Sequence, residues 1–357
     1  MGIKSTKGKN KFEQIDYKAT SDIGETLDPV FSADATGGTI LYHSADDGTS
    51  VEKYHVFTEP GYFRVSAGFA KTANVLMIAG GGGGGTWYYG GGGGAGEVLY
   101  GSNVGFGTSI SNYDRDAGSE YRVIIGEGGF SHMSGQSPGE YNNGGNGGDT
   151  ILHPTAGIAT AYRSHVGFVT EGMRAFGGGG GGSNSADGYE EGNRGGSAGG
   201  PSYYDEHERY KQRISSDLPD AWTSYGNPSG PNSNSVASGG GGAGGNSPSR
   251  TGGAGQPFPE FTAAKIGPAI PPYVYPFWNT TVGSTGLYGG GGGGAGYPAT
   301  NPNGGTGGGG DGGNGNGGGK HGEPGVDFTG SGGGGGDGPL NNGGSGGKGI
   351  LIIKYVV

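Results

Sequence analysis

The stretch that decides the fold is residues 74–85, which read Asn-Val-Leu-Met-Ile-Ala-Gly-Gly-Gly-Gly-Gly-Gly. The short apolar run at 74–79, with its β-branched residues, predicts a buried β-strand. The six glycines that follow have no side chains with which to continue that packing. The chain therefore passes at Gly80 from packing by apolar side chains to an arrangement that must depend on its backbone.

Further segments rich in Tyr, Val, Phe and Ile surround this junction and are typical of strands. They occupy 39–42, 53–58, 62–67, 97–100 and 121–125. The chain ends on the apolar run 350–357, which we expect to pair with an early strand. Between the second and third segments, Glu59-Pro60-Gly61-Tyr62 has the residues of a type II turn, which predicts a hairpin.

Glycine runs recur far beyond residue 85. The chain of 357 residues has 95 glycines and 19 prolines, and only 30% of its residues are hydrophobic. That is too little apolar side chain to form one core for a chain of this length. Further runs lie at 90–94, 177–182, 239–242, 289–294, 307–310 and 332–336, and three of them end in Gly-Ala-Gly at Ala95, Ala243 and Ala295. A flexible linker needs no such repeated ending.

Two conformations are open to these runs. Flexible coil is typical of Gly-rich linkers. The alternative is the polyproline-II conformation, whose three residues per turn point their N–H and C=O groups outward. Without Cβ atoms, such helices lie close enough to hydrogen-bond laterally, which satisfies the requirement that buried backbone groups be paired. We expect this polyglycine-II packing, clamped by aromatic residues and by the strands at the two ends of the chain.

The predicted fold is all-β, with little or no α-helix. It is a small β-sandwich closed by the C-terminal strand, with a large polyglycine-II bundle inserted. The expected parts are an extended N-terminal docking arm at 1–36, a β-sandwich-like module at 37–130 closed by 349–357, and the glycine bundle at 131–348. Two long interruptions, 201–231 and 256–281, are expected to be aromatic loops.

Charge is unevenly distributed along the chain. The net charge is −10, yet the first 18 residues carry +3 because five lysines oppose Glu13 and Asp16. We expect Lys4, Lys7, Lys9 and Lys11 to dock the arm on an acidic neighbour, and a solvated tail is the alternative. The acidic remainder disfavours nucleic acid as a partner.

The sequence predicts no membrane span, and it leaves acylation of Gly2 open. There is no apolar run of 18 residues, so we expect no span. Residues 1–6 fit the pattern for myristoylation of Gly2, which is short and therefore weak evidence.

The sequence favours no catalytic, cofactor or metal site. Cysteine is absent, which excludes disulfides and thiol chemistry. Matches to G-x-G-x-x-G lack the strand and helix that dinucleotide binding requires. Residues 144–152 fit the calcium-roll nonapeptide, but a single copy lacks the adjacent turn that shares the ion, so a glycine run leading into a short strand is expected there. We therefore expect neither an enzyme nor a cofactor.

Three segments carry a resemblance to a known family. Residues 54–58, 61–65 and 75–85 resemble the opening of a glycine-rich domain of phage and other virion-associated proteins. Residues 121–126 with 144–149 resemble its middle, and 343–355 resemble its closing strand. The whole is also loosely similar to the tip adhesins of T-even-type phages, in which polyglycine-II helices pack together and variable loops touch the host.

The resemblance implies a place on the outer surface of a virion. In one interpretation the protein is a structural component, a fibre, tail or capsid-decoration protein held to other virion proteins by residues 1–36. In the second it is an adhesin that binds a host glycan or protein. An ice-binding or other structural glycine-rich protein is a third class, and a homo-oligomer, specifically a trimer, is a further expectation.

The aromatic interruptions are the candidate contact surface, because rigid aromatic side chains give a large contact area at low entropy cost. The residues are Tyr203, Tyr204, Tyr210, Trp222 and Tyr225 in the first, and Tyr273, Tyr275, Phe277 and Trp278 in the second. The alternative is that they cap the glycine bundle. An adhesin places Trp222 and Trp278 in solvent, whereas a scaffold buries them.

Overall fold

The computed structural model describes residues 34–45, 47–66, 69, 71–87, 89–106, 119–131, 143–155, 172–183, 191–202, 218–231, 237–296, 302–314, 319–338 and 341–357. The chain divides into two units, Met1–Ser32 and Ala33–Val357. Every described residue belongs to the second unit. The predicted docking arm, with Gly2, Lys4, Lys7, Lys9 and Lys11, therefore lies outside the described residues apart from its last three positions.

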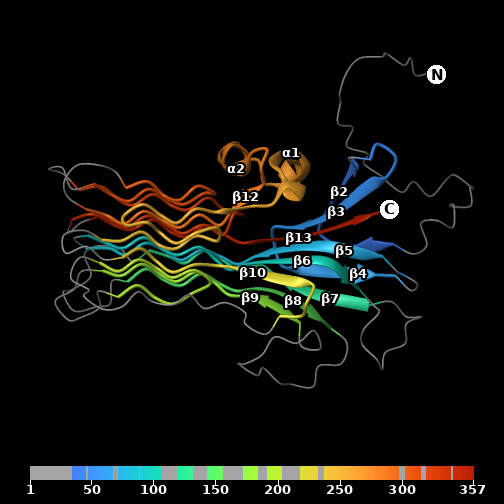
Figure 1. Ribbon diagram of the computed structural model, residues 1–357, viewed down its shortest axis with the longest axis horizontal. Coiled ribbons are helices and arrows are strands. Elements are labelled where there is room, and N and C mark those ends of the chain that lie inside the picture. The colour runs from blue at the N-terminus through green and yellow to red at the C-terminus, as the bar shows by residue number, and fades with distance from the viewer. Residues whose placement is uncertain are drawn as a thin grey trace, which may run out of the picture. The chain divides into compact units, whose positions relative to one another are not determined.

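Two antiparallel sheets form the strand-rich part of this unit (Figure 1). The six-stranded sheet has the order β10 (Trp222–Tyr225), β6 (Val98–Gly105), β5 (Thr72–Ile78), β13 (Ile350–Val356), β3 (Val51–Phe57) and β2 (Thr39–Ser44). The five-stranded sheet has the order β1 (Ala35–Thr36), β4 (Gly61–Val65), β7 (Ser119–Ile124), β8 (Thr150–Pro154) and β9 (Met173–Ala175). Apolar side chains of both sheets meet in one core, so the arrangement is sandwich-like.

The C-terminal strand lies in the middle of the larger sheet. β13 pairs with β3 on one side and β5 on the other. Leu351 and Ile353 belong to the core between the sheets, whereas Ile350 and Ile352 belong to a second core on the outer face. Burial on both faces explains why this strand reads as a continuous apolar run instead of an alternating one.

The prediction of a β protein with little helix is confirmed. The described residues contain two short α-helices, α1 (Ala263–Ile266) and α2 (Tyr275–Val282), and the 3₁₀ turns η2 (Pro259–Phe261) and η3 (Gly267–Ala269). All four lie in the interruption that we expected to be a loop. Helix α2 has a proline in its first turn, where a missing N–H is tolerated, and ends at Gly283 with a φ of 54°.

The hairpin predicted at Glu59–Tyr62 is wrong. β3 pairs with β2 and β13, so both of its edges are occupied. β4 pairs instead with β1 and β7 in the other sheet. The turn carries the chain across the sandwich, and Phe57 and Phe63 on its two sides meet in the core between the sheets. Turn residues fix the local direction of the chain, but not which strand becomes the partner.

The glycine runs leave the strands and lie side by side as an array (Figure 1). Their backbone hydrogen bonds repeat every three residues, so residues three apart bond the same neighbouring run. From the run 80–85, for example, the N–H groups of Gly80 and Gly83 donate to Gly148 and Gly145, those of Gly81 and Gly84 to Gly347 and Gly344, and those of Gly82 and Gly85 to Gly94 and Gly91. The two sheets and the array therefore share a continuous backbone network.

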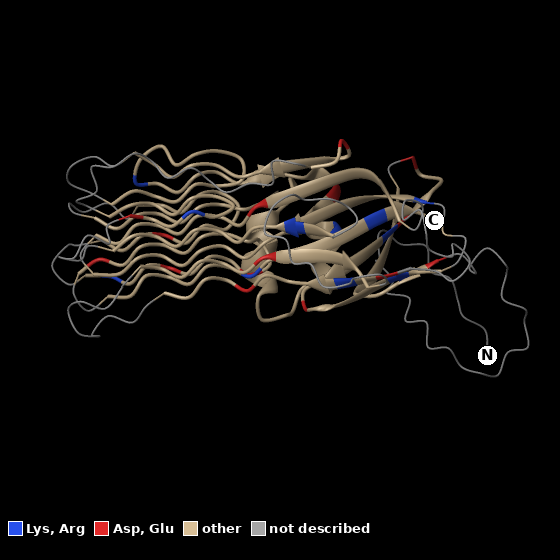
Figure 2. Ribbon diagram, turned by 90° about the horizontal axis from the view of Figure 1, so that it is seen from below, with Lys and Arg blue, Asp and Glu red and all other residues tan. Residues whose placement is uncertain are grey.

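Within the described part of the chain, the interior of this array includes four runs that have neighbours on all sides. Runs 80–85, 90–96, 289–296 and 331–337 are each hydrogen-bonded to six neighbouring runs. Each interior run thus donates in three directions and accepts from three others. Few charged residues lie on the array, and they are scattered singly along it (Figure 2).

Between the runs 143–149 and 177–183, side-chain oxygens take the place of backbone carbonyl groups as hydrogen-bond acceptors. The Oδ1 atoms of Asn143, Asn146 and Asp149 accept the N–H groups of Ser183, Gly180 and Gly177 at 2.8, 3.0 and 2.8 Å. The acceptors are three residues apart in one run and the donors three apart in the other, which matches the period of the array. The segment that fits a calcium-roll repeat therefore uses its Asn and Asp oxygens for hydrogen bonds with backbone N–H groups.

Replacing Gly180 by Ala tests whether the array requires glycine. A Cβ at Gly180 would collide with the carbonyl oxygen of Gly144, whereas a Cβ at Gly245 would meet no atom within 4 Å. We expect Gly180→Ala to lower the free energy of unfolding by more than about 3 kcal/mol, and Gly245→Ala to change it by less than about 0.5 kcal/mol. Denaturant unfolding of both variants measures this, and equal losses would contradict close packing at Gly180.

Candidate functional site

Residues 256–288 form a helical insertion closed at its base. Strand β11 (Gln256–Pro257) pairs antiparallel with β12 (Leu287–Tyr288), and η2, α1, η3 and α2 lie between them. The insertion lies on the outer face of the six-stranded sheet, close to where the glycine array begins (Figure 1). Pairing at the base makes the insertion one unit instead of an open loop.

The underside of the insertion is apolar. Phe258, Phe261 and Trp278 pack in one core with Tyr54 and Leu76 of the sheet. Trp278 is fully buried, and its Nε1 donates to the carbonyl oxygen of Phe328 at 3.2 Å. Burial of this large apolar area fixes the insertion on the sheet.

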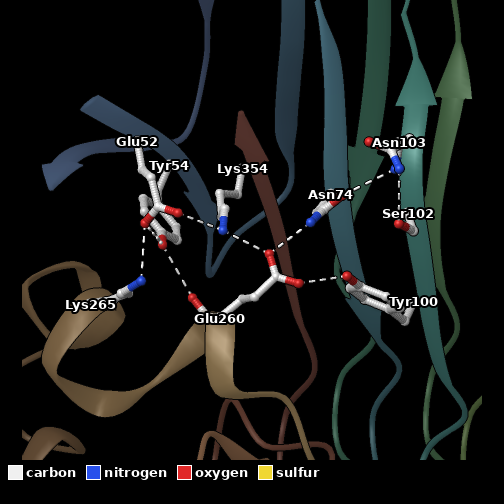
Figure 3. Close-up of polar contacts among 9 residues, drawn as sticks. All are labelled: Glu52, Tyr54, Asn74, Tyr100, Ser102, Asn103, Glu260, Lys265 and Lys354. Carbon is white, nitrogen blue, oxygen red and sulfur yellow. Dashed lines mark hydrogen bonds and ion pairs between the residues drawn. The ribbon is translucent and has the colours of Figure 1, made fainter. Parts of the chain in front are cut away.

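A cluster of polar side chains fixes one edge of the same interface (Figure 3). Glu260 of η2 lies at its centre. Its Oε2 is 2.7 Å from Nζ of Lys354 and accepts Nδ2 of Asn74 at 2.7 Å, and its Oε1 accepts the hydroxyl of Tyr100 at 2.6 Å. One carboxylate therefore ties the insertion to β13, β5 and β6.

A second carboxylate faces the same lysine. Glu52 of β3 is 2.7 Å from Nζ of Lys354 and 3.0 Å from Nζ of Lys265, and it accepts the hydroxyl of Tyr54 at 2.7 Å. Burial raises the pKa of Glu52, but the hydrogen bonds from Lys354, Tyr54 and Lys265 outweigh it and lower the pKa to about 2. Glu52 is therefore ionised at neutral pH.

The pKa values of the other two central groups also shift so as to favour the charged form of each. Burial lowers the pKa of Lys354, but its hydrogen bonds with Glu260 and Glu52 outweigh burial and raise it. Burial raises the pKa of Glu260, but Lys354, Tyr100 and Asn74 outweigh burial and lower it. In its ground state the cluster is a set of ion pairs in which opposite charges offset one another.

The outer side of the insertion exposes aromatic rings. Tyr273 is 77% exposed and Phe277 71%, and Tyr275 between them is partly exposed. We call these three residues the exposed aromatic face. The sequence has no Asp, Glu, Lys or Arg from 266 to 310, so this face carries no charge of its own. Rings of this kind suit contacts with an uncharged partner.

The structure separates the predicted contact residues into three groups. Tyr203, Tyr204 and Tyr210 lie outside the described residues. Tyr273, Tyr275 and Phe277 form the exposed aromatic face, whereas Trp222, Tyr225 and Trp278 pack inward. Trp222 is 8% and Trp278 0% exposed, and the half-buried ring of Tyr225 meets that of Phe258 edge to face at 5.4 Å between centroids.

Among the described candidates, exposed and buried rings are therefore different residues. Trp222 and Trp278 are not available to a receptor, because burial of their rings completes the two apolar cores.

The sequence reasoning missed the polar cluster and the helical period of the insertion. Ile266, Ile270, Val274, Trp278 and Val282 recur every four residues and are all buried, which is a helix signal. Glu260 is the only carboxylate between Asp220 and Asp311, so its isolation in an apolar segment was a second signal. No spacing along the chain relates Glu260 to its partners, which come from separate strands.

Residues 58–356 match a family model described as a glycine-rich domain, and the chain belongs to that family. The part of the resemblance that concerns a glycine-rich domain is thereby confirmed. No curated protein matches the chain.

No helix in the described part of the chain has the length and apolar character needed to cross a membrane. No group of three or more His, Cys, Asp or Glu side chains there is arranged to hold a metal ion.

Adjacent residues of α2 provide a test of which face anchors the insertion. Trp278→Ala removes a fully buried ring and should cost about 3–5 kcal/mol of unfolding free energy. Phe277→Ala removes an exposed ring and should change stability by less than about 0.5 kcal/mol. Thermal unfolding of the two variants measures the difference, and a stable Trp278→Ala variant would contradict the packing described above.

Proposed function

We propose that this protein is a non-enzymatic structural component of the outer surface of a virion, and that its glycine array is a stiff polyglycine-II bundle. The observation that carries the proposal is the hydrogen-bond network in which four interior runs each contact six neighbours. A network of this kind is suited to holding a shape. The proposed location comes from the resemblance to virion-associated glycine-rich proteins.

The period of the network supports the polyglycine-II conformation. In a helix of three residues per turn, successive N–H groups point in three directions, and the C=O groups do the same. Residues three apart then face the same neighbour, as Gly82 and Gly85 do toward the run 90–96. Three donor directions and three acceptor directions together account for six neighbours.

The way the array joins the sandwich supports a stiff body. The last glycine run leads through Gly349 directly into β13, at the centre of the larger sheet. We propose that β13 closes the sandwich and that closing it also fixes the array. Bending at the junction would break backbone hydrogen bonds such as that from Gly349 N–H to the Gly126 carbonyl, at 2.8 Å.

We propose that residues 1–36 dock the protein on other virion proteins and that nucleic acid is not a partner. The support for the first is the basic character of the arm on an acidic chain. The exclusion of nucleic acid is supported by the distribution of charge over the described residues. Lys and Arg are interspersed there with Asp and Glu, and Figure 2 shows no continuous basic stripe.

A second candidate function is adhesion to a host surface, and the exposed aromatic face favours it. Tyr273 and Phe277 each expose more than two thirds of their surface. Uncharged aromatic rings stack on sugars and on apolar protein surfaces with little sensitivity to salt. In this proposal the contact surface is the exposed aromatic face, not the full set of aromatic residues expected from the sequence.

Deletion of residues 1–36 tests the docking role. Because the full deletion also removes β1 and Asp34, the partner of the buried Lys53, the variant that keeps the described fold begins at Asp34, and we expect it to fold but to be absent from purified particles. Replacing Lys4, Lys7, Lys9 and Lys11 by Ala should also reduce incorporation into particles. Immunoblotting of purified particles measures incorporation, and a truncated protein present at the wild-type level would remove the docking proposal.

The double variant Tyr273→Ala, Phe277→Ala tests adhesion. We expect adsorption to host cells to fall at least about tenfold, since aromatic residues are frequent binding hot spots, while incorporation into particles stays normal. The matched control is Tyr42→Ala, Phe130→Ala, which removes two exposed aromatic rings elsewhere. Unchanged adsorption of the first variant would exclude the exposed aromatic face as a receptor site.

A further inference from the structure

Lys354 and Asn74 are placed as a reactive pair would be. They lie directly opposite each other on the paired strands β13 and β5. Both touch the same oxygen, Oε2 of Glu260, each at 2.7 Å (Figure 3). The amine nitrogen of Lys354 and the amide nitrogen of Asn74 are therefore no farther apart than twice that distance.

The backbone beside Asn74 is irregular. The register between β5 and β6 shifts between Ala73 and Val75, so Ser102 and Asn103 of β6 together oppose Asn74. Asn103 has a φ of 56°, which is uncommon for a residue other than glycine. Its N–H donates to Oδ1 of Asn74 at 3.1 Å. Bulges of this kind often redirect groups next to active sites.

We propose that Lys354 and Asn74 become joined by an intramolecular isopeptide bond, with Glu260 as the group that transfers the protons. The amine nitrogen of Lys354 bonds to Cγ of Asn74, the bond from Cγ to Nδ2 breaks, and Nδ2 leaves as ammonia. No oxidant, reductant or cofactor is required. This proposal is independent of the protein's proposed location on a virion.

The three contacts supply the parts that such an acyl transfer requires. Glu260 first accepts a proton from the Lys354 ammonium, which gives the neutral amine that attacks Cγ. The negative charge that develops on Oδ1 is stabilised by the N–H of Asn103. Glu260 then donates this proton to Nδ2, and as the bond from Cγ to Nδ2 breaks, the second proton of the Lys354 nitrogen passes through Glu260 to the departing ammonia. Overall one ammonium group and one carboxamide give one secondary amide and one ammonium ion, so atoms and charge balance.

The surroundings hold the reacting groups in this position. The hydroxyl of Tyr100 fixes the other oxygen of Glu260, and Glu260 is held over the sheet by the packed insertion. Such restraint converts an otherwise bimolecular step into one between oriented neighbours. Because the chain has no cysteine, a disulfide is not available to it, and an amide between β13 and β5 is a covalent tie of another chemistry.

The intact mass of the denatured full-length protein tests the bond. We expect the folded protein, after prolonged incubation, to be lighter than its sequence mass by one ammonia. Digestion should then yield one branched peptide that contains both residue 74 and residue 354. The full sequence mass, or a loss of water instead of ammonia, would overturn the proposal.

Two carboxylate variants assign the role of Glu260. Glu260→Gln removes the group that contacts both Lys354 and Asn74, and we expect it to slow bond formation at least about 100-fold. Glu52→Gln is the matched control, because Glu52 contacts Lys354 at the same 2.7 Å and has no hydrogen bond with Asn74 among its contacts described above. It should keep the bond.

Lys354→Arg should retain its full mass, since its guanidinium is not a nucleophile at neutral pH. Circular dichroism establishes that each variant is folded. Bond formation in folded Glu260→Gln at the wild-type rate, or in Lys354→Arg, would overturn the assignment.

Discussion

The rest of the structure depends on how closely glycine backbones approach one another. At Gly81 and Gly335, as at most positions of the array, a Cβ would collide with a carbonyl oxygen of a neighbouring run. This close approach of neighbouring runs permits hydrogen bonds between their backbones. Burial makes those bonds necessary, because the free-energy cost of an unpaired buried peptide group is larger than the net stability that one paired group contributes. A composition typical of disorder is therefore compatible with an ordered body, since the absence of side chains is what allows the backbone to supply the packing.

The sandwich decides which runs become neighbours. β5 pairs with β13 and β6, and the runs that adjoin them in the chain, 80–85, 341–349 and 90–96, continue the same pairings. Facing sheets stand about 10 Å apart because side chains fill the space between them. Where the side chains end, runs from opposite sheets bond directly, as in the hydrogen bond from Gly129 N–H to the Gly81 carbonyl. Two layers joined by apolar side chains thus become one network joined by peptide groups.

Most strands could be predicted because period and composition are local properties, whereas the helices of the insertion were expected to be a loop. The runs that became β2 to β7 and β13 were recognised, whereas β9 and β10 were missed, since Met173–Ala175 and Trp222–Tyr225 are too short to show a period. The partner of β3 could not be predicted from its turn, because the competing strand β13 lies some 300 residues away in sequence. The polar cluster was missed for the same reason. Its residues share no spacing along the chain, because the strand order brings together Glu52, Asn74, Tyr100 and Lys354, and the packed insertion adds Glu260.

The position of the polar cluster relative to the array gives it a structural meaning. β13 enters the sheet from the glycine run that ends at Gly349, and its first residue, Ile350, pairs with Ile78, next to the glycines. Lys354 pairs with Asn74 at the other end of the β5 ladder. The strand is thus held by backbone hydrogen bonds where it leaves the array and by Glu52 and Glu260 near the C-terminus. Strand pairings open first at their ends, so contacts at both ends of the ladder protect the whole of it. Because β13 lies between β3 and β5, its separation from the sheet would expose an edge of both strands. By holding β13 in place, the side chains of the cluster therefore stabilise the pairing of all three strands.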